Sequence, residues 1–176
     1  VEAGGKTIET ESSDLGDPLA FVFKTIADPY VGQISMFKVL SGTIKADSAL
    51  TNTRTGSDER LAKIATLTGK ESDLVTELVA GDIGAVTKLN NTATGDTLAP
   101  KGKPVRVPAI DKPEPVLSIA ISSTNQGEED KLANALRRLQ EEDSSLIVER
   151  SDETKQTLLR GMGETHLTIA LEKLQR

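Results

Sequence analysis

Hydrophobic positions follow two different periods along the chain, one before and one after residue 108. Up to residue 108, Val, Ile and Thr occur in short runs that Gly, Asp and Asn interrupt. Short runs of β-branched residues between turn residues are typical of strands. The runs predict strands at residues 20–27, 34–40, 48–53, 59–67 and 82–89. Many short strands with no convincing helix between them favour an antiparallel barrel or a sandwich.

Three connections in this region carry residues that are typical of turns. They are Ala46-Asp47, Thr55-Gly56-Ser57 and Ala80-Gly81. Glycine tolerates a positive φ angle, and an Asp side chain can bond its own backbone. We therefore expect tight turns at these three places.

Proline marks the boundary between the two regions. Pro104, Pro108, Pro113 and Pro115 fall within residues 103–115. Proline has no N–H donor and disfavours helix in the preceding residue, so this stretch is expected to be extended and outside any sheet interior. We predict a barrel domain at residues 17–108, a stiff linker at 109–115 and a second domain at 116–176.

After the linker, the pattern predicts strands and helices in alternation. Residues 116–122 alternate as a strand, and Leu132, Leu136 and Leu139 share one face of a helix over residues 127–142. Two strands at 146–150 and 156–160 and a helix at 164–175 follow. This order is the start of a ferredoxin-like domain without its last strand. The predicted fold class is therefore mixed, an antiparallel β-barrel followed by an α+β ferredoxin-like domain.

Composition and charge exclude several classes of function. The net charge is −6, which excludes a module held to nucleic acid by bulk positive charge, and we expect no DNA partner. RNA contact through a few local cations stays open. The absence of Cys and the single His exclude a disulfide framework, a thiolate zinc site and a multi-histidine metal site. No apolar run is long enough to span a membrane, so we expect no membrane partner.

Motifs of common enzymes are missing from the sequence. It contains neither a G-x-x-x-x-G-K-[ST] phosphate loop nor a G-x-S-x-G or H-E-x-x-H motif. The acidic clusters at 128–130 and 141–143 are interpreted as solvated ends of one helix. His166 follows Gly161-Met162-Gly163-Glu164 in the first turn of the last helix, where free N–H groups favour anions or polar partners. From the residues alone, His166 is either a surface residue after a glycine turn or part of a recognition site.

Six segments in register carry a family resemblance. They are DPLAFVFKTIADPYVGQISMFKVLSGTIK (17–45), LVAGDIGAVTKL (78–89), TGDTL (94–98), KPEPVLSIAI (112–121), LRRLQEEDSSLIVE (136–149) and GMGETHLTIALEKL (161–174). Together they resemble the second and third domains of bacterial translation elongation factor G, over residues 17–176. The resemblance implies the β-barrel of translational GTPases followed by a ferredoxin-like domain.

What the resemblance implies about function concerns a longer protein. Residues 1–16 look like the connector from a preceding GTPase domain, so the chain is expected to be part of a GTP-hydrolysing translation factor. In that family the factor promotes translocation during protein biosynthesis in the cytoplasm. The implied partners are small-subunit ribosomal RNA and protein, together with the parent's own GTPase domain. GTP and Mg are implied for that domain, and we expect no catalytic, cofactor-binding or metal-binding residue in this chain.

Two groups of candidate site residues follow from the resemblance and from side-chain chemistry. Tyr30, Lys45 and Arg54 are candidates for ribosomal RNA contact, since Tyr can stack and Lys or Arg can meet phosphates. The second group would lie on the third-domain face that meets the GTPase domain or the ribosome, near the family's fusidic acid pocket. Its members are Ser145, Gly161, Met162, Gly163, Glu164, His166 and Lys173.

The sequence also departs from the family pattern. Ser144 stands where Pro is usual, Leu146 where Phe, Thr165 where Leu, and Lys173 where Arg. These departures suggest a divergent paralogue and leave fusidic acid sensitivity open. Three alternatives remain beside this interpretation: a ribosome-protection GTPase of the tetracycline-resistance type, a stand-alone RNA- or ribosome-binding module, and an enzyme acting through Glu164 and His166, for which no second catalytic group is identifiable.

Overall fold

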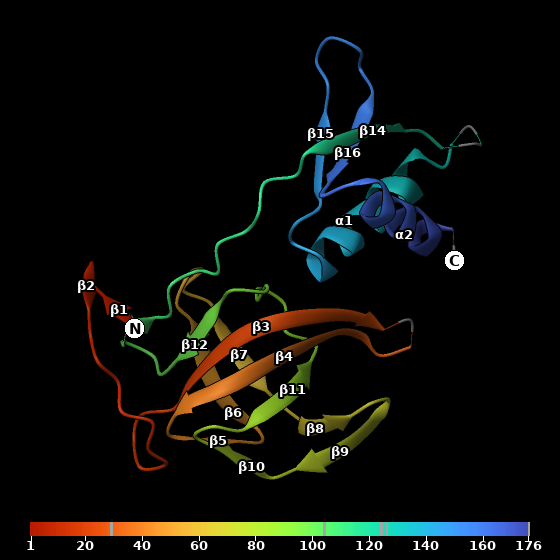
Figure 1. The fold of residues 1–176 in the computed structure, drawn as a ribbon. Helices are drawn as coiled ribbons and strands as arrows, with labels where there is room; N and C mark the ends of the chain where they lie inside the picture. Colours follow the sequence, from red (N-terminus) through yellow and green to blue (C-terminus); the bar gives the residue numbers. More distant parts are fainter. Residues whose placement is uncertain (29, 104, 124, 126, 176) are drawn as a thin grey trace. The chain divides into compact units, whose positions relative to one another are not determined.

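The computed structural model describes residues 1–28, 30–103, 105–123, 125 and 127–175. The chain divides into two compact units, Val1–Ile110 and Asp111–Arg176, and the division falls within the predicted linker. Figure 1 labels the elements of each unit. Among the described residues, neither helix is long and apolar enough to cross a membrane.

The first unit is built from antiparallel strands. Two long strands, β3 (Leu19–Asp28) and β4 (Gly32–Ser41), form a hairpin at its centre (Figure 1). The sheet has the order β7-β6-β12-β3-β4-β11-β8-β9, so β7 and β9 are its edges and it is a curled half-barrel. Its other strands are β6 (Ser48–Asn52), β7 (Asp58–Leu61), β8 (Ile64–Thr68), β9 (Glu71–Val75), β11 (Ile83–Thr87) and β12 (Thr97–Ala99).

Two small sheets complete this unit. The strands β5 (Thr43–Lys45) and β10 (Glu77–Val79) pair with each other. The strands β1 (Glu2–Ala3) and β2 (Lys6–Thr7) join β13 (Val105–Arg106) in the order β13-β1-β2. The N-terminal residues thus pair with the stretch that precedes the predicted linker, where β13 lies at a sheet edge.

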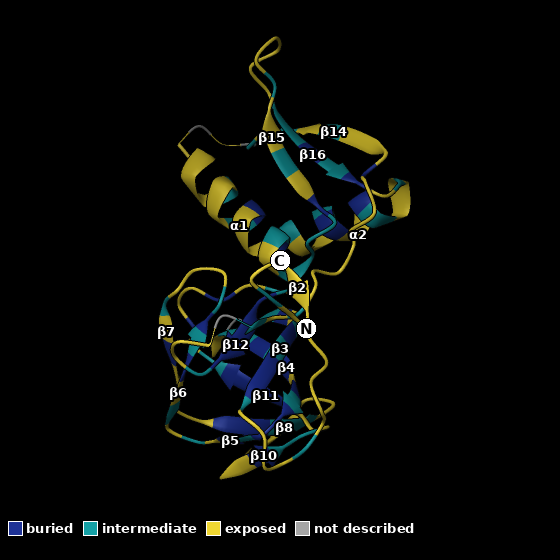
Figure 2. Cartoon of the chain, turned by 90° about the vertical axis from the view of Figure 1, so that its left-hand side faces the viewer, coloured by how far each residue is buried: buried dark blue, intermediate teal, exposed yellow. Residues whose placement is uncertain are grey.

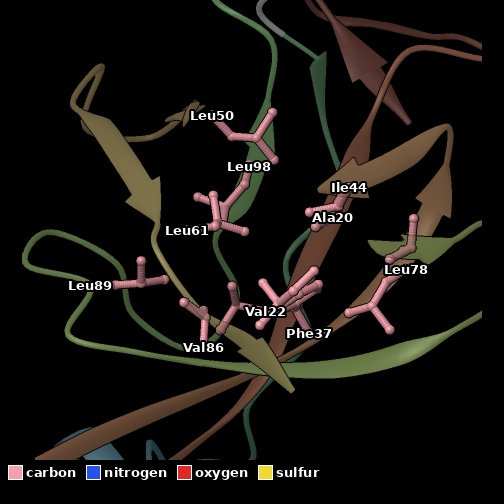
Figure 3. Packing of buried hydrophobic residues seen from close by; sticks show 12 residues of the cluster. Ala20, Val22, Phe37, Ile44, Leu50, Leu61, Leu78, Val86, Leu89 and Leu98 are labelled. Carbon is pink, nitrogen blue, oxygen red and sulfur yellow. The ribbon is translucent and has the colours of Figure 1, made fainter. Parts of the chain in front are cut away.

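The core of the half-barrel comes from alternate positions of its strands. Val22 on β3 and Phe37 on β4 are fully buried cross-strand neighbours, and Val86 of β11 lies beside them (Figure 3). The cluster is aliphatic apart from Phe37, as the low aromatic content requires. Buried residues concentrate in the strands of this sheet (Figure 2). The cluster comprises Ala20, Val22, Phe37, Val39, Ile44, Leu50, Leu61, Ile64, Leu78, Val86, Leu89 and Leu98.

The strand predictions succeeded where apolar residues alternate and failed where they do not. The single strand predicted over 59–67 is two strands, because β7 pairs with β6 whereas β8 pairs with β11. The sequence pattern also missed β5, β9, β10 and β12. β9 is mostly exposed and the other three are only three residues long, so none shows a clear apolar alternation.

The second unit has the order β-α-β-β-α. Its elements are β14 (Leu117–Ile121), α1 (Glu129–Glu142), β15 (Ile147–Arg150), β16 (Thr157–Gly161) and α2 (Glu164–Leu174). The sheet order is β14-β16-β15, which matches the first three strands of a ferredoxin-like sheet. Leu136 and Leu139 of α1 and Leu167 of α2 are buried in a common core with Leu159 of β16. Among the described residues, β14 pairs with no strand on its other side. The predicted fold class is confirmed.

Candidate functional site

Asp143 organises the end of α1. Its Oδ1 accepts hydrogen bonds from the backbone N–H of Ser145 at 2.9 Å and from the Ser145 hydroxyl at 2.5 Å. Its Oδ2 lies 2.9 Å from Nε2 of His166. Burial by itself raises the pKa of the Asp143 carboxyl, but the hydrogen bonds from Ser145 and His166 outweigh burial and hold that pKa below its ordinary value.

His166 ties the end of α1 to the turn between β16 and α2. Its Nδ1 accepts the Met162 backbone N–H at 3.1 Å, so the proton of the neutral ring lies on Nε2, which donates to Asp143. The side chain is 22% exposed, so it is neither free at the surface nor part of the core. We call Asp143, Ser145, Met162 and His166 the α1–α2 latch.

The two glycines that flank Met162 differ in what they do. A Cβ on Gly161 would lie 2.8 Å from Leu167 Cδ2 and 3.2 Å from His166 Nδ1, so a larger residue there would force the buried Leu167 side chain to shift. A Cβ on Gly163 would meet nothing within 4 Å, and its φ of 164° is extended backbone that any residue adopts. The structure thus gives a steric reason for one glycine of the motif and none for the other.

The remaining residues of this group lie around the latch. Lys173 pairs with Glu142 at 2.9 Å and so adds a second contact between α2 and the end of α1. Glu164 is exposed in the first turn of α2, where the helix dipole favours a carboxylate. Two of the family departures are accommodated locally, since Leu146 is buried in the core and Thr165 is exposed.

Tyr30 lies at the tip of the β3–β4 hairpin and is 95% exposed. Asp28 shapes the turn, because its Oδ1 accepts the backbone N–H groups of Tyr30 and Val31, each at 2.8 Å. These two backbone hydrogen bonds lower the pKa of the Asp28 carboxyl. The hairpin therefore presents an exposed aromatic side chain whose own backbone N–H is bonded to Asp28.

Arg54 is engaged within the first unit. Its Nε and Nη2 donate to Asp96 Oδ1 and Oδ2 at 2.6 and 2.8 Å, a bidentate pair. The Arg54 side chain is 46% exposed, whereas that of Asp96 is only 4% exposed. Burial raises the pKa of the Asp96 carboxyl, but hydrogen bonds from Arg54, the Ala93 amide and Asn52 outweigh it and lower that pKa overall.

Lys45 lies at the other end of β6 from Arg54. β6 begins at Ser48 and ends at Asn52, so about 13 Å of strand separates the two ends. Lys45 is exposed at the end of β5, opposite Glu77 of β10. The structure thus bonds Arg54 to the segment that leads into β12, a neighbour of β3, and leaves Lys45 apart from it.

Two carboxylates of these sites were missed by the sequence analysis. Asp143 lies in the acidic run 141–143, which looks the same as a solvated helix end, and its partner His166 is 23 residues away. Asp96 lies in the TGDTL segment and its partner Arg54 is 42 residues away. The described residues contain no group of three or more His, Asp or Glu side chains that could hold a metal ion.

Family models match the sequence of each of the two units. The family model described as elongation factor G domain 2 matches residues 17–101, and the model described as elongation factor G domain III matches residues 112–176. A protein from Thermus thermophilus with a known crystal structure shares 37% sequence identity with this chain, and the two structures superpose with a TM-score of 0.82. That similarity covers 91% of this chain and 24% of the Thermus chain, so the present chain spans about a quarter of that relative. The chain belongs to the elongation factor G family and carries its domains 2 and III.

Proposed function

We propose that the chain is the ribosome-binding part of an elongation factor G-like translational GTPase that promotes translocation in the cytoplasm. The observation that supports this most is the match to both domains in one chain and in family order. Both models name elongation factor G, which favours a translocase over a ribosome-protection protein. GTP and Mg would bind in a GTPase domain outside the region described, and these two domains would neither bind nor hydrolyse GTP.

The half-barrel is proposed to contact small-subunit ribosomal RNA. Tyr30 supports this role best, because an almost fully exposed aromatic side chain at a hairpin tip can stack on a base. Lys45 and Arg54 were predicted from the sequence as phosphate contacts. Lys45 lies opposite the exposed carboxylate of Glu77, which makes it the weaker of the two candidates.

The α1–α2 latch is proposed to face the GTPase domain or the ribosome. Met162, a member of the latch, and the nearby Glu164 are both exposed. This surface therefore offers a partner one apolar side chain and one carboxylate. A partner that contacts this surface would also affect the end of α1, because His166 is bonded to Asp143 there. A relay between the nucleotide state and the rest of the factor by movement of domains needs a contact between helices that can respond to a partner, and the α1–α2 latch offers one.

Cosedimentation of this chain with purified ribosomes at several salt concentrations tests the proposal. We expect binding that weakens with salt, and a loss of about tenfold for Tyr30→Ala, since stacking contributes roughly 1–3 kcal/mol per base. Leu74→Ala is the matched control, because Leu74 is also an exposed hydrophobic side chain (66%) but lies on the edge strand β9 of the same sheet. Calorimetric titration with GTP and Mg should give only heat of dilution. Absence of ribosome binding, or micromolar affinity for GTP, would contradict the proposal.

A further inference from the structure

We propose that Arg54 is a positioning residue that acts through Asp96 on the loop 88–96, and that this loop, rather than Arg54 itself, meets RNA phosphates beside Tyr30. This inference rests on the proposed function and refines it. It concerns the loop that leaves β11 after Thr87 and enters β12 at Thr97.

Two buried carboxylates hold the backbone of this loop. Glu59 is 3% exposed and accepts the backbone N–H groups of Asn90 and Asn91 at 3.2 and 2.6 Å and the Thr92 hydroxyl at 3.0 Å. Asp96 accepts the Ala93 backbone N–H at 2.8 Å. A carboxylate that receives several N–H donors fixes the loop in one conformation, because each donor loses its partner if the loop moves.

Asn52 joins the two carboxylates into one network. Its Nδ2 donates to Asp96 Oδ2 at 2.8 Å and to the carbonyl of Asn91 at 3.0 Å, and it lies 3.3 Å from Thr92 Oγ1. Arg54 closes the network from the outside with its bidentate contact to Asp96. Two guanidinium donors are thus already committed to a carboxylate in the geometry that a phosphate would need.

The loop in turn is bonded to the hairpin that carries Tyr30. Lys88 donates its backbone N–H to the Gln33 carbonyl at 3.3 Å, and Gln33 Nε2 lies 3.5 Å from the Thr92 carbonyl. The hydroxyl groups of Thr25 and Thr94 are 2.9 Å apart. The loop is therefore bonded directly to both strands of the hairpin, β3 and β4.

The exposed groups of this end suit RNA. Lys88, Asn90 and Asn91 are exposed on the loop, offering one ammonium group and two amides for phosphates and base edges. The carboxylates of Glu59 and Asp96 at this end are buried, and the accessible Asp28 carboxylate accepts two backbone N–H groups of its own turn. At the Lys45 end, Lys45 lies opposite the exposed Glu77, and the exposed Asp47 pairs with Arg60 at 3.1 Å, so the cations there already have carboxylates nearby.

Arg54 could bind a phosphate directly or could position the loop. Asp96→Asn separates these two roles, because they predict opposite changes in affinity for the small ribosomal subunit. If Arg54 were a phosphate ligand, removing its internal anionic partner would free the guanidinium and strengthen binding to purified small ribosomal subunits. If Arg54 positions the loop, Asp96→Asn and Arg54→Ala should each weaken binding about fivefold. The double variant should then be no weaker than either single variant, since both remove the same interaction. Tighter binding of Asp96→Asn, or additive losses, would overturn the inference.

Charge-preserving and salt-dependent controls sharpen the test. Arg54→Lys keeps the charge but loses the bidentate fork, so it should bind as weakly as Arg54→Ala, whereas a phosphate ligand would be rescued by lysine. Lys88→Ala should reduce the slope of log affinity against log salt by about 0.7–0.9, the value of one phosphate contact, while Arg54→Ala should leave that slope unchanged.

A measurement without RNA tests the positioning step alone. Hydrogen exchange at residues 90–96 should be faster in Asp96→Asn and in Arg54→Ala than in the unaltered chain. Residues 116–122 of the second unit are the internal control, and their exchange should stay unchanged if the chain remains folded. Unchanged exchange at Ala93 would overturn the inference even if binding fell. Failure of the unaltered chain to bind small subunits overturns the proposed function together with this inference, whereas tighter binding of Asp96→Asn overturns only the inference.

Discussion

Asp96 in the half-barrel and Asp143 in the second unit do the same job in different surroundings. Each aspartate holds a loop by accepting a backbone N–H, and each has a lowered pKa because hydrogen bonds outweigh its burial. Asp96 is almost fully buried and its cationic partner is an arginine, which stays charged at every accessible pH. Asp143 is 42% exposed and its partner is a histidine whose ring is bonded on both sides.

This difference indicates how easily the hydrogen bonds of each network can be broken. Removing a partner of Asp96 leaves a buried carboxylate short of a donor, which is costly, so the network of Asn52, Arg54, Glu59 and Asp96, here called the brace, resists change. The α1–α2 latch is accessible to water, which can replace its hydrogen bonds at modest cost. We therefore expect the half-barrel loop to behave as a rigid recognition surface and the latch to yield more easily to a partner.

The largest effect should come from Asp96→Ala, which breaks the brace. The change removes contacts to Arg54, Asn52 and the Ala93 amide, leaves the part-buried Ala93 N–H without its acceptor, and takes one of three acceptors from Asn52. Since Arg54 is about half exposed and can be rehydrated, we expect a loss of about 2–3 kcal/mol in the free energy of unfolding of the half-barrel. Denaturant unfolding monitored by hydrogen exchange in each unit measures it, and a loss below about 1 kcal/mol would contradict the comparison.

Acid removes the same charge without a mutation. A carboxyl whose folded-state pKa is lowered stabilises the fold fully above its ordinary pKa of 3.8, and this contribution is lost as pH falls through the lowered value. Stability of the half-barrel should therefore fall below about pH 4, and Asp96→Asn should flatten that fall. An acid transition that is identical in Asp96→Asn would show that other carboxylates dominate it.

Gly161→Ala and Gly163→Ala form a matched pair on either side of Met162. The first places a methyl group 2.8 Å from buried Leu167 and should destabilise the second unit by about 2 kcal/mol, the usual cost of overpacking. The second has open space and an extended backbone, so its effect should stay within about 0.5 kcal/mol. Thermal unfolding of the two variants side by side is the measurement, and equal losses would refute the steric assignment.

His166→Ala should cost less than the changes above. It leaves Asp143 with its Ser145 contacts and exposes the Met162 N–H to water, so we expect about 1 kcal/mol in the second unit. In a full-length factor, we expect His166→Ala to lower ribosome-coupled GTP turnover at temperatures where the variant remains folded. A loss of stability as large as that of Asp96→Ala would mean that the latch is as rigid as the brace.

Lys173→Ala should give the smallest effect. Lys173 is 50% exposed and its pair with Glu142 lies near water, so the change should cost at most about 0.5 kcal/mol and vanish at high salt. Lys173→Arg, which restores the family residue, should leave stability unchanged. A large loss in Lys173→Ala that persists at high salt would show that the pair contributes more than a surface ion pair does.

Local chemistry made parts of this structure predictable from the sequence. The apolar alternation of 20–27 and 34–40 identified β3 and β4, and the Leu spacing identified both helices within two residues. Of the predicted turn positions, Asp47, Gly56 and Gly81 do adopt positive φ angles. These features depend on neighbours within one strand, one helical turn or one tight turn, and such neighbours can be identified in a sequence.

The brace and the latch depend on contacts that no local pattern records. Asn52 and Asp96 are 44 residues apart and meet only because β6 and β12 are neighbours in the sheet. β12 has three residues and is fully buried, so it shows no alternation that could have placed it there. The family resemblance identified positions such as His166, but the identity of their partners needed the fold.

The edge of β14 that pairs with no strand among the described residues has a practical consequence for work with these two domains. Residues 116–122 contain no charge and no proline, and Leu117 is partly exposed. Such an edge can add a strand from another molecule, so concentrated samples are prone to aggregate through this unit. Lysine at Ser118 or Ala120, which are exposed, would place a charge on that edge and keep the protein dispersed without touching the core.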